Sequence, residues 1–284
     1  MSSYAKINLS LDITGVSGGY HTLDSVVVTL DLADVIAVRK RKKDKLVSIT
    51  MHGRGSESIP FEDNNAVKAA ESFISRYDTC GADITIWKNI PVGAGLGGSS
   101  ADVSGTLRAL ERLFAIDDKE GIKVIADSLG SDCGYMLYGG YARLKGRGEE
   151  VELLNADLPL DIGLLVPKTG VSTAQCYKKF DKLSLHCGAS GEEVSGAVLS
   201  GDKQRLGRAL HNDLFKSASA LNSSVLTAYD ELVAFAPLGV SMTGSGSAVF
   251  AIFENDSFAR YALSRYRGES EFIITKTKLP RRED

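Results

Sequence analysis

The sequence predicts an α+β protein built from two domains. Three observations lead to this prediction: strand-like alternation near the N-terminus, a glycine-rich loop directly before a predicted helix, and a second half whose elements follow the order β-α-β-β-α-β. The chain has 284 residues, of which 43% are hydrophobic and 24% are charged. This length and composition suffice for two modest domains with packed cores.

Paired antiparallel strands are predicted at the start of the chain. Apolar and polar side chains alternate over residues 7–12, glycines form a turn at 15–19, and a β-branched run follows at 26–30. The alternation indicates strands with one apolar face.

A helix, a strand and a second helix are predicted next. Two asparagines can cap a helix over residues 64–77, and residues 82–88 alternate as a strand. After the glycine-rich loop, Ser99 and Ser100 can cap a helix whose apolar side chains repeat at helical spacing over 103–114.

The order of elements in the second half predicts a ferredoxin-like domain. In this prediction all helices between its first two strands count as one crossover connection. Its elements are strands at 162–166, 240–243 and 248–253, a helix at 257–266 and a strand at 271–277. The polar, proline-containing stretch 155–159 divides an N-terminal domain, residues 1–156, from a C-terminal domain, residues 157–284. The Gly- and Ser-rich stretch 184–203 is predicted to be a mobile loop.

Composition argues against several classes of partner. A formal charge of -3 gives no general attraction to nucleic acid, and the basic run 39–45 is predicted to be a solvated turn between strands. No stretch approaches the ~20 apolar residues of a membrane span, so no membrane association is expected. The four cysteines include no C-x-x-C pair, which predicts neither a disulfide framework nor a metal site and favours a cytoplasmic location.

The strongest functional signal is the glycine-rich loop. Its backbone can turn tightly, and the free N–H groups and positive dipole end of the following helix attract phosphate oxygens. Because the loop stands directly at a helix start, a triphosphate site is favoured over a plain flexible connection. The spacing matches neither the P-loop nor G-x-G-x-x-G. The candidate phosphate-binding residues are Pro91, Val92, Gly93, Ala94, Gly95, Leu96, Gly97, Gly98, Ser99, Ser100 and Ala101.

A second glycine-rich segment, residues 242–248, includes Gly244 and Ser245 and lies between two predicted strands. Taken alone, this segment is typical of a hairpin turn. Beside the first loop, it is a candidate for a second wall of the phosphate site.

Two charged residues are candidates for catalysis. Asp132 lies in a short polar turn, where it can cap a helix or can orient and deprotonate an attacking hydroxyl. Lys6, in the first predicted strand, is either a charge at a sheet edge or an inward cation that offsets developing phosphoryl charge. Both pairs of alternatives remain open at the level of sequence.

An aromatic side chain and an imidazole stand together after a glycine turn. Tyr20 can stack on a nucleobase, and His21 can form hydrogen bonds to the edge of a base. Ordinary packing within the turn is the alternative.

These motifs resemble those of a known superfamily, the galactokinase, homoserine kinase, mevalonate kinase and phosphomevalonate kinase superfamily, or GHMP kinases. Three segments resemble its three motifs, in chain order: 6–9, 91–102 and 243–246. Four short segments, at 5–9, 19–23, 130–132 and 146–149, resemble one branch of this superfamily. That branch phosphorylates a cytidine-diphosphate-linked methylerythritol in the non-mevalonate route to isoprenoids. The resemblance extends to about residue 253.

The resemblance implies a fold and a reaction. The expected N-terminal domain is ribosomal-protein-S5-domain-2-like, with an unusual left-handed crossover, and the C-terminal domain is ferredoxin-like. The implied reaction is transfer of phosphate from ATP, with Mg²⁺, to a hydroxyl of a small-molecule substrate. A monomer or a homodimer is expected.

The resemblance also implies roles for individual residues. Asp132 would be the base or orienting carboxylate and Lys6 its charge partner. Asn8 would bind the erythritol hydroxyls. The remaining substrate contacts would come from Tyr20, His21, Tyr177, Gly244 and Ser245, and Mg²⁺ would be carried with ATP and held through Ser99 or Ser100.

Two positions depart from the family pattern. The loop lacks a small residue that the family commonly has before its two serines, and Cys133 follows Asp132 where the family usually has Val-Pro. Without the fixed φ of proline, the turn that carries the carboxylate differs in stiffness. The alternatives to the main interpretation are another GHMP-type kinase acting on mevalonate, homoserine or a sugar, and a non-catalytic ligand-binding relative.

Overall fold

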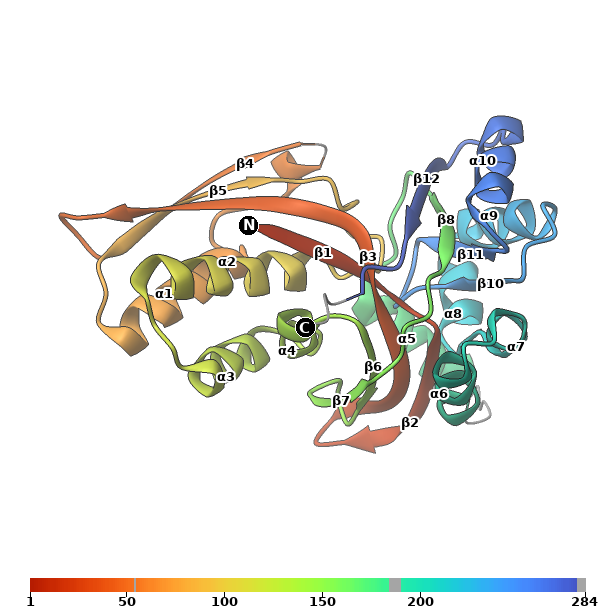
Figure 1. The fold of residues 1–284 in the computed structure, drawn as a ribbon, viewed down its shortest axis with the longest axis horizontal. Helices are drawn as coiled ribbons and strands as arrows, with labels where there is room; N and C mark the ends of the chain where they lie inside the picture. Colours follow the sequence, from red (N-terminus) through yellow and green to blue (C-terminus); the bar gives the residue numbers. More distant parts are fainter. Residues whose placement is uncertain (54, 184–189, 280–284) are drawn as a thin grey trace. The chain divides into compact units, whose positions relative to one another are not determined.

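The computed structural model describes residues 1–53, 55–183 and 190–279 (Figure 1). Contacts divide the chain into two compact units. Unit 1 comprises residues 1–5, 32–92 and 97–138, and unit 2 comprises residues 6–31, 93–96 and 139–284. In the described part of the chain, no helix is both long enough and apolar enough to cross a membrane.

Unit 1 contains strands and helices from the first half of the chain. Its elements are the start of β1 (Ser2–Asn8), the later part of β3 (Tyr20–Arg41), β4 (Val47–His52), the 3₁₀ helix η1 (Ser56–Ser58), α1 (Asn65–Tyr77), β5 (Gly81–Trp87), α2 (Gly98–Phe114), α3 (Lys119–Leu129) and α4 (Cys133–Tyr138). β5 pairs antiparallel with β3 and parallel with β4. The basic run 39–45 spans the end of β3 and the turn before β4, which confirms the predicted turn.

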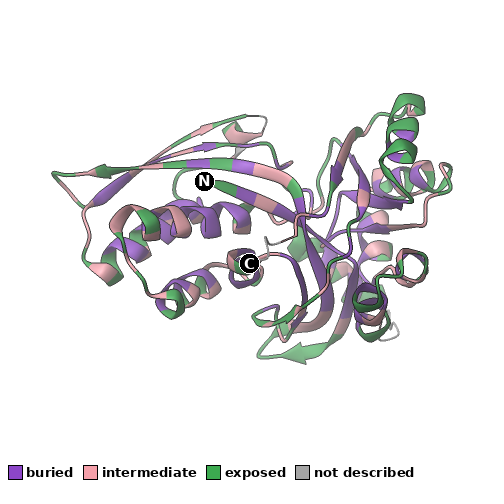
Figure 2. Cartoon of the chain, in the orientation of Figure 1, coloured by how far each residue is buried: buried purple, intermediate pink, exposed green. Residues whose placement is uncertain are grey.

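Apolar side chains of the helices and strands form the core of unit 1. Phe73 of α1, Ile84 of β5 and Leu107 of α2 are at most 1% exposed and belong to one cluster. Figure 2 shows the buried faces of these helices beside exposed ones. Burying one such side chain stabilises the unit by about 1.5–3 kcal/mol, so Phe73→Ala would leave a destabilising cavity.

The two long helices of unit 1 begin differently. Asn64 caps α1 through a hydrogen bond from Ala66 N–H at 2.9 Å, as predicted. The predicted capping of α2 by Ser99 and Ser100 is wrong, because α2 already begins at Gly98. Gly97, with a left-handed φ of 73°, stands at the N-cap, and both serines lie in the first turn.

Unit 2 contains most of the second half of the chain. Its elements are the end of β1, β2 (Ser10–Ser17), the start of β3, β6 (Tyr141–Lys145), β7 (Glu150–Leu154), β8 (Asp161–Val166), α5 (Thr173–Leu183), α6 (Gly191–Ser200), α7 (Lys203–Ala209), β9 (His211–Asn212), α8 (Phe215–Leu221), α9 (Ser223–Val233), β10 (Gly239–Met242), β11 (Val249–Phe253), α10 (Asp256–Arg265) and β12 (Glu271–Lys276). β3 pairs with β2 and β6, and β9 runs parallel to β2.

A four-stranded antiparallel sheet, in the order β10-β11-β8-β12, confirms the ferredoxin-like prediction. Gly163 in β8 faces the rings of Phe253 and Phe272, and an added Cβ would come within 2.8 Å of each. The small residue therefore lets two aromatic side chains pack against the central strand.

The N-terminal strands differ from the expected half-exposed pattern. The polar residues Asn8, Ser10 and Asp12 are at most 4% exposed. Each forms hydrogen bonds within unit 2, which offsets the cost of burying its polar atoms.

The predicted loop at 184–203 is also corrected. Residues 184–189, and with them Cys187, lie outside the described residues, but Gly191–Ser200 form α6. Val194, Ala197 and Val198 are buried on one face of this helix. Tertiary burial of this face outweighs the low helix propensity of Gly and Ser.

Candidate active site

The glycine-rich loop has a backbone conformation that depends on its glycines. Gly93, Gly95 and Gly97 have φ values of 68°, 79° and 73°, a region that glycine adopts readily. Among the described residues, no side chain caps the N-terminus of α2, which follows directly. The N–H groups of the first helical turn therefore remain available to a phosphate.

In unit 1, the turn that carries Asp132 lies against the first turn of α2. The Ser100 hydroxyl forms a hydrogen bond with the thiol of Cys133, the residue after Asp132. A Cβ added at Gly130 would lie 3.7 Å from Ser100 Oγ. Asp132 is half-buried, and its backbone carbonyl accepts from Met136 N–H at 3.0 Å at the start of α4. The turn that carries this carboxylate thus lies beside the helix start that is a candidate for phosphate binding.

A buried ion triad lies at the same helix start. Lys88 Nζ donates to Asp34 at 2.5 Å and to Asp102 at 2.6 Å. Asp34 also accepts from the N–H groups of Asn89 and Ile90 at 2.6 and 2.9 Å, which fixes the chain just before the loop. Asp102 Oδ1 has no hydrogen-bond partner among the described residues, and burial raises the pKa of the Asp102 carboxyl to about 7.

In unit 2, Lys6 and Asn8 lie against the other two motifs. Lys6 N–H donates to the Leu96 carbonyl at 3.0 Å, and Lys6 Nζ donates to Asn8 Oδ1 at 2.6 Å. The same Asn8 oxygen accepts from Gly244 N–H at 3.0 Å. Lys6 is only 3% exposed, so it is not a charge at a solvated sheet edge.

The second glycine segment packs directly on the first. A Cβ added at Gly95 would come within 2.3 Å of the Thr243 carbonyl oxygen, and Thr243 Oγ1 lies 3.1 Å from the Gly95 carbonyl oxygen. The buried Ser245 hydroxyl shares a hydrogen bond with Thr173 at 2.8 Å. The segment is therefore part of the loop's surroundings and not an isolated hairpin turn.

His21 is held in a polar and aromatic setting within unit 2. Its ring centroid lies 4.8 Å from that of Tyr177, with an interplanar angle of 32°. Its Nε2 lies 2.7 Å from Asp181 Oδ1, so the carboxylate fixes the orientation of the imidazole. We call Tyr20, His21, Tyr177 and Asp181 the aromatic platform.

Arg147 covers one face of Tyr20. Its guanidinium carbon lies 4.1 Å from the centroid of the Tyr20 ring, a cation–π geometry. The Arg147 N–H donates to Glu149 Oε2 at 2.6 Å. Tyr20 is nevertheless 58% exposed.

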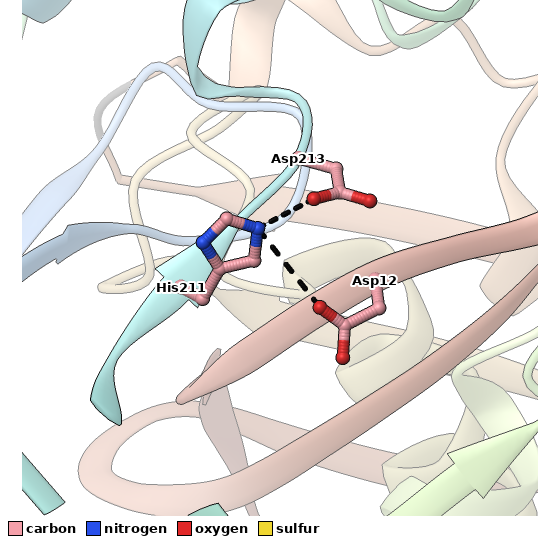
Figure 3. Close-up of side chains that lie close together, drawn as sticks. All are labelled: Asp12, His211 and Asp213. Atoms are coloured by element: carbon pink, nitrogen blue, oxygen red, sulfur yellow. Dashed lines mark hydrogen bonds and ion pairs between the residues drawn. The ribbon is translucent and has the colours of Figure 1, made fainter. Parts of the chain in front are cut away.

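A cluster of His211, Asp213 and Asp12 lies where β9 meets β2 (Figure 3). His211 Nε2 lies 2.5 Å from Asp213 Oδ1 and 3.9 Å from Asp12 Oδ1. The hydrogen bond to Asp213 raises the pKa of His211. Asp213 also accepts from Ile13 N–H, and Asp12 from the N–H and hydroxyl of Ser190. Because these carboxylates already accept several hydrogen bonds, we interpret the cluster as an anchor between strands and not as a metal site.

The predicted residues thus form three groups. Lys6 and Asn8 meet the two glycine segments, Ser100 meets the Asp132 turn, and His21 meets Tyr177. Lys6 and Asp132 belong to different units, and their pairing stays a prediction.

Sequence reasoning missed several residues that border these groups. The missed residues are Asp34, Lys88, Asp102, Arg147 and Asp181. The triad could have been found from Lys88, because a charged residue beside a strongly apolar strand is unusual and needs a partner when it is buried. The sequence around Asp181 gives no such indication, because an acidic residue on a polar helix is usually solvated.

Two family models match the chain: GHMP kinases N terminal domain over residues 64–140 and GHMP kinases C terminal over residues 183–267. The 4-diphosphocytidyl-2-C-methyl-D-erythritol kinase of Clostridium tetani is 33% identical over 283 residues, which cover 98% of this chain and 99% of that protein. The chain belongs to the GHMP kinases. As a member of this family it is an ATP-dependent kinase.

Other relatives of this GHMP kinase agree. The protein of the same name from Desulfitobacterium hafniense is 36% identical over 282 residues, covering 98% of this chain and 95% of that protein. A crystal structure of 4-(cytidine 5'-diphospho)-2C-methyl-D-erythritol kinase matches with a TM-score of 0.81 and 27% identity, over 98% of each chain. Homoserine kinase from Cytophaga hutchinsonii, at 17% identity and a TM-score of 0.75 over 98% of this chain and 94% of that one, shares the fold. The two-domain GHMP kinase fold predicted from sequence is confirmed.

Proposed function

We propose that this GHMP kinase transfers the γ-phosphoryl group of ATP to the 2-hydroxyl of 4-diphosphocytidyl-2-C-methyl-D-erythritol, in non-mevalonate isoprenoid precursor biosynthesis. The observation that carries the proposal is the aromatic platform, in a chain similar over its whole length to kinases of that name. In the reaction, the substrate oxygen forms a bond to the γ-phosphorus, the bond from that phosphorus to ADP breaks, and the hydroxyl proton leaves.

The phosphates of ATP are proposed to lie at the glycine loop and the first turn of α2. Uncapped N–H groups and the helix dipole support this placement, because both favour negative charge. Gly93, with open space beside its Cα, would let the loop backbone approach a phosphate closely.

Asp132 is proposed to orient the 2-hydroxyl and to accept its proton. Its turn lies beside Ser100, which supports a position near the transferred group. Lys6 is proposed as its charge partner, and the hydrogen bond to Asn8 would hold the ammonium in place. Asn8 is then both a support for Lys6 and, through its remaining N–H, a ligand for the erythritol hydroxyls.

Mg²⁺ is proposed to accompany ATP. The hydroxyls of Ser99 and Ser100 are hard oxygen donors of the kind that Mg²⁺ prefers, so the residues at this helix start fit the ion. When bound, the ion would neutralise charge on the phosphates.

The aromatic platform is proposed to bind cytosine. Tyr20 and Tyr177 would offer ring faces to the base. A carboxylate accepts and does not donate, so Asp181 favours a proton on His21 Nε2 and leaves Nδ1 as an acceptor. That acceptor matches the exocyclic amino group of cytosine and mismatches the carbonyl of uracil.

We also propose a domain boundary between residues 156 and 157, a monomer or homodimer, no nucleic-acid partner and a location in the cytoplasm. The net charge of -3 supports the absence of a nucleic-acid partner. The three described cysteines, all unpaired, support the cytoplasmic location.

Turnover of a panel of alcohols with ATP and Mg²⁺ tests the function. We expect the cytidyl compound to be phosphorylated with the highest kcat/KM, well above mevalonate, homoserine and galactose. A preference for one of the other alcohols would assign the protein to another GHMP kinase activity. No turnover of any of them, with ATP bound, would favour a non-catalytic relative.

A further inference from the structure

Asn212 connects the anchor between strands to the second glycine segment. It is the last residue of β9, which runs parallel to β2 with Ser10 opposite His211 and Leu11 opposite Asn212. Its side chain is largely buried, the residue being 7% exposed. No motif in the sequence singles it out.

The residues on both sides of Asn212 are fixed firmly. Asp213 N–H donates to the Leu11 carbonyl at 2.9 Å, and the Asp213 carboxylate accepts from Ile13 N–H at 2.7 Å and from His211. Figure 3 shows that one nitrogen of the His211 imidazole is directed toward both carboxylates of the cluster. These interactions hold the Asn212 backbone against β2.

The Asn212 amide uses all of its donors on the glycine segment. Its Nδ2 donates to the carbonyl oxygens of Met242 at 2.8 Å and Gly244 at 2.9 Å, while Oδ1 accepts from Leu214 N–H at 2.9 Å. Two carbonyl partners on one side and an N–H partner on the other leave only one orientation of the amide. Asn212 therefore holds the backbone on both sides of Thr243.

The backbone that Asn212 holds is the one that meets the candidate catalytic strand. Gly244 N–H donates to Asn8 Oδ1 at 3.0 Å, and that oxygen also accepts from Lys6 Nζ at 2.6 Å. A shift of the 242–244 backbone would remove one of these hydrogen bonds and move the acceptor that orients the ammonium.

We propose that Asn212 is a positioning residue for phosphoryl transfer, which holds the 242–244 backbone so that Gly244 fixes Asn8 and, through it, Lys6. The inference rests on the proposed function, because it takes Lys6 as the charge partner of the reaction. Asn212 is not a catalytic residue, since it acts only through other groups.

The test uses an isosteric variant. Asn212→Asp keeps the size of the side chain and the acceptor for Leu214 N–H, but an ionised carboxylate has no donor for the two carbonyl oxygens. Asn222→Asp is the matched control: Asn222 likewise donates twice from Nδ2, to the carbonyl and hydroxyl oxygens of Thr169, and accepts a backbone N–H, that of Ser224.

We expect Asn212→Asp to lower kcat by roughly 10- to 100-fold, the range for a small misplacement of reacting groups. The KM for the cytidyl substrate should rise by less than kcat falls, because the aromatic platform is unchanged and only the contact through Asn8 is disturbed. As pH falls, the introduced carboxyl takes up a proton and regains one donor, so the ratio of variant to native kcat should rise. The titratable groups of the neighbouring anchor, His211, Asp213 and Asp12, are common to both proteins.

The inference would be overturned if Asn212→Asp kept the native kcat and showed only a lower melting temperature. It would also be overturned if Asn222→Asp lost as much kcat as Asn212→Asp. The proposed function is tested separately by turnover of the native protein. If that fails, amide hydrogen exchange still decides the inference: the Gly244 N–H should exchange faster in Asn212→Asp than in the native protein or Asn222→Asp. Unchanged exchange would contradict it.

Discussion

For Asp132 the sequence left two roles open, a helix cap and a catalytic carboxylate. Its backbone begins α4, and its turn lies beside Ser100 at the start of α2. The backbone position of Asp132 is thus fixed by the helix, which is compatible with the proposed role of its carboxylate in proton transfer.

We expect Asp132→Asn to lower kcat by roughly 10²–10⁴, the range for positioned proton transfer. ATP affinity should hardly change, because the amide keeps the size of the side chain and the backbone of α4. Steady-state kinetics and calorimetric ATP titration measure both quantities. Asp127→Asn, which breaks an ion pair with Lys123, is the control and should retain near-native kcat. Near-native turnover in Asp132→Asn would leave Asp132 only the helix-starting role.

A second prediction concerns His21. The uridine analogue of the substrate should react with a much lower kcat/KM than the cytidine compound, because its carbonyl meets the Nδ1 acceptor and leaves both groups unpaired. His21→Ala should shrink this difference, since the acceptor is then gone. Competition kinetics with the two analogues measure the ratio. Equal kcat/KM values for both analogues in the native protein would remove cytosine from the aromatic platform.

At the scale of elements, the two glycine segments depend on one another. Gly95 approaches the Thr243 carbonyl so closely that a Cβ has no room, and its φ of 79° disfavours any other residue. The sequence indicates a tight loop here, but which segment it touches follows from the arrangement of β10 and β11 beside the loop.

Gly95→Ala should weaken ATP binding by about tenfold or more, or at least ~1.4 kcal/mol, because the methyl group displaces the loop from its phosphate-binding shape. Gly201→Ala is the control: its φ of 71° is similar, but nothing lies within 4 Å of the added Cβ. Fluorescence titration with an ATP analogue compares the two variants. Unchanged affinity in a folded Gly95→Ala protein would argue that the loop does not bind ATP.

The helix α6 shows why a local pattern can fail. Glycine and serine favour loops when considered alone, yet the buried Asp12 carboxylate accepts the N–H groups of Ser190 and Gly191 at the start of this helix. A capping partner about 180 positions away in the chain cannot be inferred from local sequence.

At the scale of the molecule, the buried triad makes stability depend on pH. The folded-state pKa of Asp102 is raised from 3.8 to about 7, so the folded protein binds this proton more tightly than the unfolded chain does. The stability linked to this proton is fully present below about pH 3.8 and is lost as pH rises through about 7.

We therefore expect the free energy of unfolding of Asp102→Asn to increase relative to that of the native protein as pH rises from 4 to 8. Asp118→Asn supplies a control of opposite sign. Hydrogen bonds from Gly121 N–H and Tyr77 lower the pKa of Asp118, so its contribution is present above the unfolded-state pKa and lost as pH falls. Chemical denaturation at several pH values measures these differences. Parallel pH profiles for native protein and Asp102→Asn would contradict the raised pKa.

The sequence by itself determined the first strands, the helices that flank the glycine loop and the ferredoxin-like second half, because periodicity, caps and glycine patterns are local. It also singled out 91–101, Asp132 and His21 as candidate site residues, the last two with the help of the family resemblance. Only the tertiary structure decided that Lys6 is buried against Asn8, that Asp181 orients His21, and that Lys88 lies between Asp34 and Asp102. These are contacts between residues far apart in the chain or on different elements, and their energies depend on burial and on distances that no local pattern encodes.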